Sequence, residues 1–430
     1  RRCRGHRAVL AVRLRGGAGD PVSGSRDLTN RAPPINVEVL PAPAERTHVP
    51  FPLDVPESQL RRRRSQKWQA YPEDVLPMFV AETDVLLAPA IRERLTAAVV
   101  DGDTGYFTEI ERFAGVCARF YSRFGYEVPE ETVVPVNDVG VGVRESLART
   151  LPPGAGVVYT PPVYMPFGPW IRRVGMSPVA VPLLDHDDDN PRLDLPGIER
   201  ALAEGARAVL LSHPHNPTGV LHSVAELAEL AELAARYDAV VVSDEIWAPL
   251  TMPGVDFTSF LAVSETAREV GLAISSASKA FNLAGLKCAF VINGNPGKFA
   301  VPRSALSGAV GHFGALAGEA AMTLSLDWLD EMRAALASNL DLMETLLAEH
   351  LPRARWRRPD AGFVAWIDLR GYPGLGDDPA AVFLDEGRVA LSNGPAFGAE
   401  GKGFVRVNFA CSEEILTEAF ERMGRVAAAH

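Results

Sequence analysis

The sequence SSASKAFNLAGLK, residues 275–287, follows a short apolar run that predicts a buried strand. In this stretch Lys279 stands among small hydroxyl residues. A lysine is strongly hydrated and seldom buried without a purpose, and one purpose is Schiff-base chemistry by a partly desolvated amine. The hydroxyls of Ser276 and Ser278 and the cation of Lys287 would suit an anionic group such as a phosphate beside that amine. A solvated loop lysine would give the same local pattern.

Two further apolar runs also end in polar loops. Ala208–Ser212 leads into His213–Gly219, and Ala239–Val242 leads into Ser243–Trp247. Parallel strands present their carboxyl ends at one edge of a sheet, where ligands of α/β proteins bind. The three strand ends therefore predict one shared site.

Strand and helix patterns alternate from residue 132 to 291, which predicts an α/β fold with a mostly parallel sheet flanked by helices. Later patterns predict a smaller α+β domain built from both chain ends. A capping box at Ser223–Glu226 predicts the start of a helix that runs to Tyr237. The other predicted elements are the helices Pro89–Val100, Ile110–Phe124 and parts of Leu316–Leu351, and the strands Thr132–Val136, Val157–Tyr159, Gly362–Leu369 and Phe404–Phe409.

Composition excludes several classes of protein. The 430 residues carry a net charge of −11 and no basic patch with interleaved aromatics, so nucleic acid is not expected as a partner. No segment predicts a membrane span. The four cysteines are far apart, without the spacing of a metal site, and suit a reducing cytoplasm.

Together these features resemble the fold-type-I enzymes that use pyridoxal 5′-phosphate (PLP), the aminotransferase superfamily, and within it the MalY/PatB-like C–S lyase branch of cystathionine β-lyases. The resemblance extends from about Arg64 to Met423. It includes LPMFVAETD, residues 76–84, which is similar to the branch motif L-P-x-W-V-A-D-x-D with Phe79 and Glu82 in place of Trp and Asp. The resemblance implies an α/β fold of type I and a PLP-dependent enzyme.

The resemblance also implies a role for each matching residue. Lys279 would bind PLP as a Schiff base and remove the substrate's Cα proton, and Asp244 would face the pyridine nitrogen. Asn216 would donate to the phenolic oxygen of the ring, Tyr164 would stack on the ring, and Arg406 would bind the substrate carboxylate.

The phosphate of PLP would be bound by a second set of residues. Small residues between a strand and a helix let backbone N–H groups approach a phosphate. The family's tyrosine reaches the phosphate of the neighbouring subunit, so the resemblance implies a homodimer. The phosphate-side residues are Val139, Gly140, Ser276, Ser278, Lys287 and, from the partner subunit, Tyr106.

Two positions depart from the family pattern. Lys287 stands where many relatives have arginine, which keeps the charge but not the fork geometry. Trp247 stands where aminotransferases commonly have tyrosine and C–S lyases histidine. An indole N–H can donate but cannot act as a base, so Trp247 is expected only to bind beside the cofactor. The histidines His213, His215 and His312 could line the site or be structural.

The resulting prediction is a PLP-dependent C–S β-lyase that acts on cystathionine or cysteine S-conjugates, with an aminotransferase as the alternative. A regulatory relative without activity is disfavoured by the retained Lys279, Asp244 and Arg406. The predicted parts of the chain are a disordered or artificially added extension at 1–56, an N-terminal segment at 57–104 that joins the small domain, the large PLP-binding domain at 105–315 and the C-terminal small domain at 316–430.

Other interpretations fit less well. Ser276–Lys279 also matches S-x-x-K, the signature of penicillin-binding serine acyltransferases, but the required K-T-G partner is missing. A dinucleotide motif at Gly140-x-Gly142 fails because Glu145 stands where the third glycine is needed. The acidic run Asp185–Asn190 predicts a solvated loop rather than a metal site. A targeting peptide is the alternative for the N-terminal extension.

Overall fold

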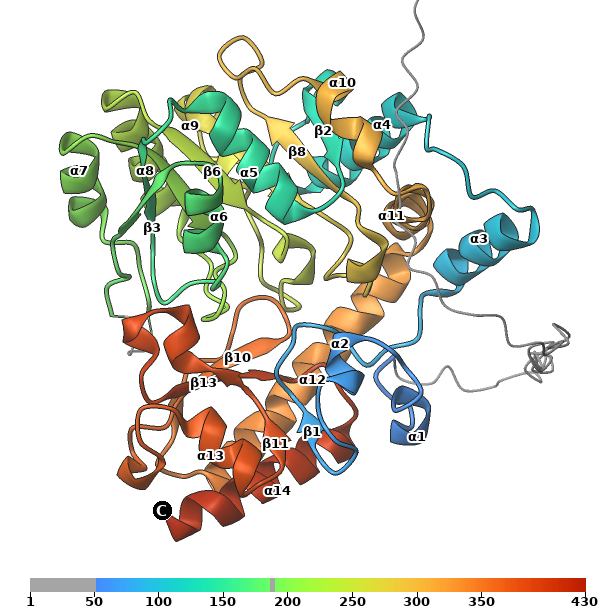
Figure 1. Cartoon of the computed structure of the whole chain (residues 1–430), viewed down its shortest axis with the longest axis vertical. Helices are drawn as coiled ribbons and strands as arrows, with labels where there is room; N and C mark the ends of the chain where they lie inside the picture. The colour runs from blue at the N-terminus through green and yellow to red at the C-terminus, as the bar shows by residue number, and fades with distance from the viewer. Residues whose placement is uncertain (1–51, 186–189) are drawn as a thin grey trace, which may run out of the picture. The chain divides into compact units, whose positions relative to one another are not determined.

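The computed structural model describes residues 52–185 and 190–430 (Figure 1). Most of the predicted N-terminal extension, residues 1–51, lies outside the described residues, and so do positions 186–189 of the acidic run. Within the described part, no helix is both long and apolar enough to cross a membrane.

A seven-stranded sheet in the order β2-β8-β7-β6-β5-β3-β4 forms the centre of the larger part of the described chain. Strands β3 to β7 pair in parallel, and β8 runs antiparallel to both of its neighbours. The mostly parallel sheet is thus confirmed. The strands are β2 (Val133–Val136), β3 (Gly156–Tyr159), β4 (Ser177–Ala180), β5 (Ala206–Ser212), β6 (Val240–Asp244), β7 (Gly271–Ser275) and β8 (Ala289–Asn293).

Helices cover both faces of this sheet because its central strands are apolar on both sides. In β5, Val209 and Leu211 join one core while Ala208 and Leu210 join the other, as the two-residue period of a strand requires. The first core also includes residues of α4 (Ile110–Tyr121), α7 (Leu195–Ala203), α8 (Val224–Arg236), α9 (Glu265–Val270) and α11 (His312–Leu324). The second includes residues of α5 (Val139–Thr150), α6 (Phe167–Arg173) and α10 (Arg303–Leu306).

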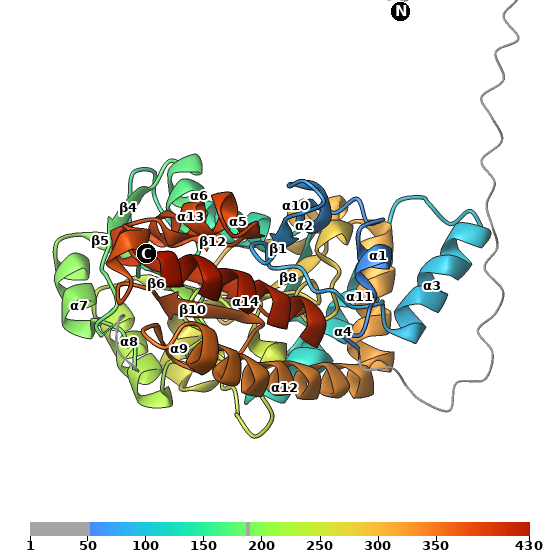
Figure 2. The same cartoon turned by 90° about the horizontal axis from the view of Figure 1, so that it is seen from below.

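A smaller antiparallel sheet in the order β12-β13-β10-β9 lies below the large one in Figure 1. Two long helices, α12 (Leu326–His350) and α14 (Glu413–Ala429), cover it and lie side by side in Figure 2. The remaining elements of this part are α13 (Pro379–Asp385), β9 (Arg355–Trp356), β10 (Val364–Asp368), β12 (Ser392–Asn393) and β13 (Phe404–Asn408).

The N-terminal segment packs against this smaller sheet, so both ends of the described chain meet there (Figure 1). Strand β1 (Leu76–Pro77) pairs in parallel with β11 (Val389–Ala390). The segment also contains α1 (Glu57–Leu60), α2 (Gln66–Gln69) and α3 (Pro89–Val100).

A buried ion pair anchors the segment 76–84. The Nζ atom of Lys67 lies 2.7 Å from Oδ2 of Asp84, and Nε1 of Trp68 donates to Oδ1 of the same carboxylate at 2.8 Å. Both charged side chains are fully buried, which is tolerated only when each charge has partners. The residues before Asp84 run beside the small sheet, because Met78 N–H donates to the Ala390 carbonyl and Asn408 N–H donates to the Met78 carbonyl.

Several predicted elements match the structure closely. The predicted helix Pro89–Val100 is α3, and the capping box of Ser223 and Glu226 is present at the start of α8. The predicted helical region 316–351 is two helices, because Ser325 leaves the helical conformation with φ −125° and ψ 26°. Its hydroxyl donates to the Ala320 carbonyl at 3.1 Å and so satisfies the end of α11.

Candidate active site

The strands β5, β6 and β7 end at the same edge of the large sheet. They pair in parallel, and Ser212 at the end of β5 is in register with Asp244 at the end of β6. The polar loops that follow the three strands therefore open side by side, as predicted from their order in the sequence.

Lys279 lies in the loop after β7. Its Nζ atom donates to the backbone carbonyl of Ala81 at 2.7 Å and lies 5.7 Å from the centre of the Trp247 ring. Burial, together with the nearby Arg406 cation, lowers the pKa of the Lys279 amine to about 8, although the Glu82 and Asp244 carboxylates partly offset this lowering. A substantial fraction of this amine is therefore neutral near pH 8, as a nucleophile or general base requires.

The Asp244 carboxyl is buried at the end of β6. Burial raises the pKa of this carboxyl to about 7. Two groups oppose the rise: the Ile246 N–H, which donates to Oδ1 at 3.2 Å, and the Lys279 cation. Among the described residues no cation lies within salt-bridge distance of Asp244. A buried carboxyl without a paired cation fits a ligand that carries a protonated ring nitrogen.

Arg406, from β13, reaches across to the large sheet. Its Nη1 donates to Oδ1 of Asn216 at 2.9 Å, and its Nη2 donates to Ser392 Oγ and to the Phe79 carbonyl, both at 3.1 Å. Its buried Nε has no partner among the described residues. Burial lowers the pKa of the guanidinium to about 10, so the cation persists at neutral pH. An unsatisfied buried donor on a cation fits a carboxylate ligand.

The amino end of α5 lies beside the same loops. Asp138 caps the helix, because its Oδ1 accepts the N–H of Val141 at 2.8 Å, and its Oδ2 lies 3.5 Å from Nζ of Lys287. Gly140 is required here, since a Cβ atom would lie 2.6 Å from the ring of Trp170. A helix amino end with a nearby cation is a suitable place for a phosphate.

These groups surround one cavity of about 470 Å³. Most of the sequence-predicted residues line it, namely Val139, Gly140, Tyr164, Asn216, Asp244, Trp247, Ser278, Lys279, Lys287 and Arg406. Ser276 does not line it but lies behind it, where its hydroxyl contacts Ser278 Oγ at 2.6 Å and donates to the Cys288 carbonyl at 2.7 Å. Ser276 thus orients Ser278.

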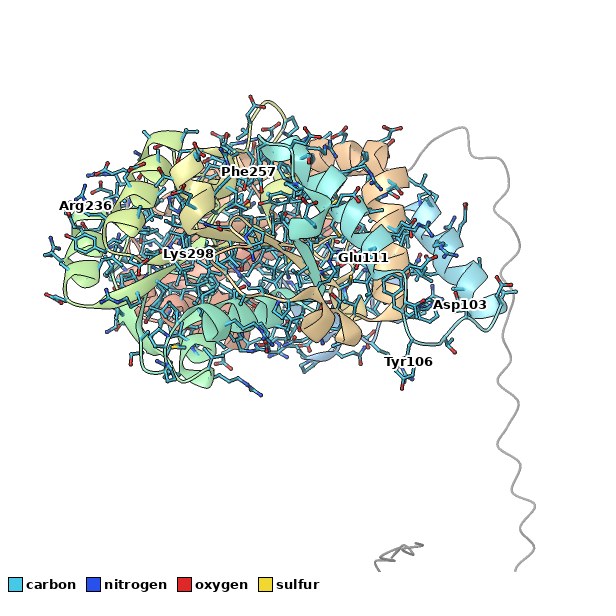
Figure 3. All side chains as sticks on the ribbon, turned by 90° about the horizontal axis from the view of Figure 1, so that it is seen from above. Asp103, Tyr106, Glu111, Arg236, Phe257 and Lys298 are labelled. Carbon is cyan, nitrogen blue, oxygen red and sulfur yellow. The ribbon has the colours of Figure 1, made fainter. Side chains whose placement is uncertain are left out.

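Tyr106 does not contribute to the cavity within this chain. Tyr106 lies in the loop between α3 and α4, and its side chain is 95% exposed and points outward (Figure 3). A role for this tyrosine would therefore require a second chain.

The histidines in question do not line the cavity. His213 and His215 are buried and do not line the cavity. Nε2 of His312, on α11, lies 3.0 Å from Oδ2 of Asp103. The site also contains residues that the sequence did not assign to it. Phe79 and Ala81 belong to the recognised segment 76–84, so a signal for them existed, whereas Gln66, Trp170 and Ser392 carry no local signal.

Comparisons with known proteins identify the family of this chain. Residues 107–423 match the family described as "Aminotransferase class I and II". The chain is 33% identical over 375 residues to "Cystathionine beta-lyase" of Corynebacterium glutamicum, which covers 86% of this chain and 98% of that protein. It is 31% identical over 372 residues to "Cystathionine beta-lyase PatB" of Bacillus subtilis, which covers 84% of this chain and 96% of that protein.

A solved structure shows the same fold. The PLP-bound C–S lyase from Staphylococcus hominis superimposes with a TM-score of 0.80 at 21% identity, over 88% of this chain and 98% of that one. The predicted type I fold and the predicted family are both confirmed. This chain belongs to the aminotransferase class I and II family.

Proposed function

We propose that this protein is a PLP-dependent C–S β-lyase that cleaves cystathionine or other cysteine S-conjugates. One observation carries the proposal. The Lys279 amine, whose pKa burial lowers to about 8, faces the same cavity as the Asp244 carboxyl and the Arg406 guanidinium. The names of the relatives, cystathionine β-lyases at 31% and 33% identity, support the lyase reaction.

The cavity residues fit PLP by their chemistry. Asp244 offers a buried carboxyl for the pyridine nitrogen, and Asn216 keeps its amide N–H₂ available as a donor because Arg406 occupies its Oδ1. Ser278, Lys287 and the backbone N–H groups at the start of α5 would hold the phosphate. When bound, PLP supplies an electron sink for the electron pair released at the substrate Cα.

The remaining steps belong to the side chains of this protein. Arg406 would bind the substrate α-carboxylate, using its unpaired Nε and exchanging its contact with Ser392. Lys279 would take the Cα proton, for which a pKa of about 8 is suitable near neutral pH. The Cβ–S bond then breaks, the thiol leaves with a proton, and hydrolysis of the remainder gives pyruvate and ammonia.

The test is to supply the purified, PLP-loaded protein with L-cystathionine and to assay thiol and pyruvate together. We expect the two products in equal amounts without an added 2-oxo acid. Keto-acid formation that requires a 2-oxo acid acceptor, with no thiol, would instead support the aminotransferase alternative.

The Lys279→Ala variant should keep its fold and lose covalent attachment of PLP, because it lacks the buried amine that donates to the Ala81 carbonyl. Reduction with borohydride followed by peptide mass spectrometry should place a pyridoxyl group on Lys279 of the wild type. A pyridoxyl group on Lys287 or Lys67 would contradict the assignment. Circular dichroism of the variant serves as the folding control.

We also propose that the enzyme works as a homodimer in the cytoplasm. The exposed Tyr106 supports a dimer, because in this family a tyrosine from the neighbouring subunit completes the phosphate site. The free thiols of Cys117, Cys288 and Cys411 support a reducing compartment.

A further inference from the structure

A second cavity, of about 590 Å³, adjoins the candidate active site. Gln66 and Ala284 line both cavities, so the two spaces meet at these residues. The second cavity lies between the segment 82–92 and the loop after Lys279. Its place beside the reacting centre makes it available to the distal part of a bound substrate.

The second cavity carries charges of both signs. Arg63 is held in place, since its Nη1 and Nη2 donate to the carbonyls of Thr83 at 3.3 Å and Val85 at 2.6 Å. Arg92, in the first turn of α3, is exposed, and its guanidinium has no hydrogen bond or ion pair to any other described residue. The cavity thus contains a cation that is free to bind an anionic group.

Glu82 supplies the opposite charge in the second cavity. Its carboxylate is close enough to act electrostatically on Arg63 on one side and on Lys279 on the other. Backbone contacts hold the residue in place, because Asn408 Nδ2 donates to the Glu82 carbonyl at 2.6 Å. The carboxylate is therefore positioned to attract an ammonium group that extends out of the active site.

The active-site cavity has no comparable charges to spare. In the proposed function Lys287, which lies 3.5 Å from Asp138, holds the phosphate. Lys279 and Asp244 serve the rest of the cofactor, and Arg406 binds the α-carboxylate. The walls left for the sulfur substituent include Phe79, Met165 and Trp170. A charged group buried against such walls would lose its hydration without gaining partners.

We infer that the second cavity binds the far end of thioether substrates that carry a second amino-acid head group, with Arg92 taking its carboxylate and Glu82 its ammonium. The inference rests on the proposed lyase function and specifies its substrate class. Cysteine S-conjugates with a short alkyl group end at the apolar walls and do not reach the second cavity. Thioethers of the cystathionine type occupy both.

The test compares two substrates in the PLP-loaded enzyme. Pyruvate release is measured with L-cystathionine and with S-ethyl-L-cysteine for the wild type and for Arg92→Ala. The variant should raise KM for cystathionine about fivefold with kcat unchanged, because one exposed charge contact is lost in ground state and transition state alike. Its kcat/KM for S-ethyl-L-cysteine should stay within about twofold of the wild type, since that substrate does not meet Arg92.

Two further variants sharpen the comparison. Arg94→Ala removes the same charge from an exposed position of the same helix that lines neither cavity, so both substrates should keep their wild-type kinetics. Arg92→Lys keeps the charge and should restore most of the affinity for cystathionine.

The outcomes separate this inference from the proposed function. A wild type that cleaves S-ethyl-L-cysteine but not cystathionine would overturn the inference and leave the lyase function standing. Equal effects of Arg92→Ala on both substrates, or no effect on either, would also overturn it. A wild type that releases pyruvate from neither substrate would remove the lyase function together with the inference.

Discussion

The Glu82 carboxylate, which lines the second cavity, acts electrostatically on the Lys279 amine. Because the Glu82 carboxylate opposes the lowering of the Lys279 pKa, Glu82→Gln should lower that pKa below about 8. The neutral amine is the form that attacks the aldehyde of PLP. PLP capture by the apoenzyme should therefore accelerate as the pH rises through about 8 in the wild type, and the midpoint should lie at lower pH in the variant.

Stopped-flow absorbance of apoenzyme mixed with PLP at several pH values measures this midpoint. Glu93→Gln, at an exposed position of α3, is the matched control and should keep the wild-type midpoint. A midpoint that Glu82→Gln leaves unchanged would show that the carboxylate does not act on the amine.

Trp247 shapes the cavity as a fixed wall. Its side chain is 4% exposed, and its ring packs edge-to-face against Phe363 with the ring centres 4.8 Å apart. Gly362 also lies against the ring, because a Cβ atom at that position would be 3.0 Å from it. Trp247→His should keep or raise C–S lyase turnover. It should also favour bulkier S-substituents, raising kcat/KM by about tenfold for each added methylene that the wild-type pocket excludes. Trp247→Tyr should shift flux toward transamination.

The measurement is pyruvate against keto-acid formation across a series of S-alkyl cysteines for the wild type and both variants. The expected signature is a change of size preference rather than a uniform loss. If all three proteins share one product ratio and one size preference, Trp247 is only a packing residue.

At the scale of elements, the loop after β5 buries three histidines, His213, His215 and His222, called here the histidine cluster. Burial lowers the pKa of each imidazole to about 3. The folded cluster is neutral, whereas an unfolded histidine titrates near pH 6.5. Below that pH the unfolded state binds more protons, so stability should fall as the pH falls from about 6.5 toward 3.

The expected slope is about 1.4 kcal/mol per pH unit for each histidine, or about 4 kcal/mol for the cluster, over this window. Urea unfolding of the apoenzyme between pH 4 and pH 7 measures it. His222→Leu removes one titrating group and should reduce the slope by about one third. An unchanged slope in this variant would mean that other groups cause the acid sensitivity.

At the scale of the whole molecule, exposed apolar side chains gather around α3 and the loop after it. Val100 is 78% exposed and Tyr106 is 95% exposed. Figure 3 shows the Tyr106 side chain projecting from the surface. We expect a second copy of the chain to cover Val100 and Tyr106, at the opposite end of α3 from Arg92. Val100→Asp should therefore weaken the dimer, and Tyr106→Phe should weaken PLP binding by about 1–2 kcal/mol through a lost bond to a charged phosphate.

Sedimentation velocity and PLP titration of the apoenzyme test these two effects. Val224→Asp, which changes another exposed valine at the start of α8, is the control and should leave the dimer intact. A wild type that is monomeric and fully active would contradict the proposed dimer.

The sequence by itself determined the elements and the core of the site. The strands β5 to β7 and the helix α3 follow from apolar periodicity, and the start of α8 follows from its capping box, because these signals are local. The order of strands and loops also placed Lys279, Asp244 and Asn216 at one sheet edge, since parallel strands end together. The family resemblance added Arg406 and Tyr164, which periodicity alone would not single out.

Only the tertiary structure decided how distant residues complete the site. The Lys279 amine meets the Ala81 carbonyl from 198 positions away, and Arg406 meets Asn216 from 190 positions away. Trp170 covers Gly140, and the second cavity opens between α3 and the loop after Lys279. Such contacts depend on how the packed elements lie against one another, and a local pattern contains no information about a partner so far along the chain.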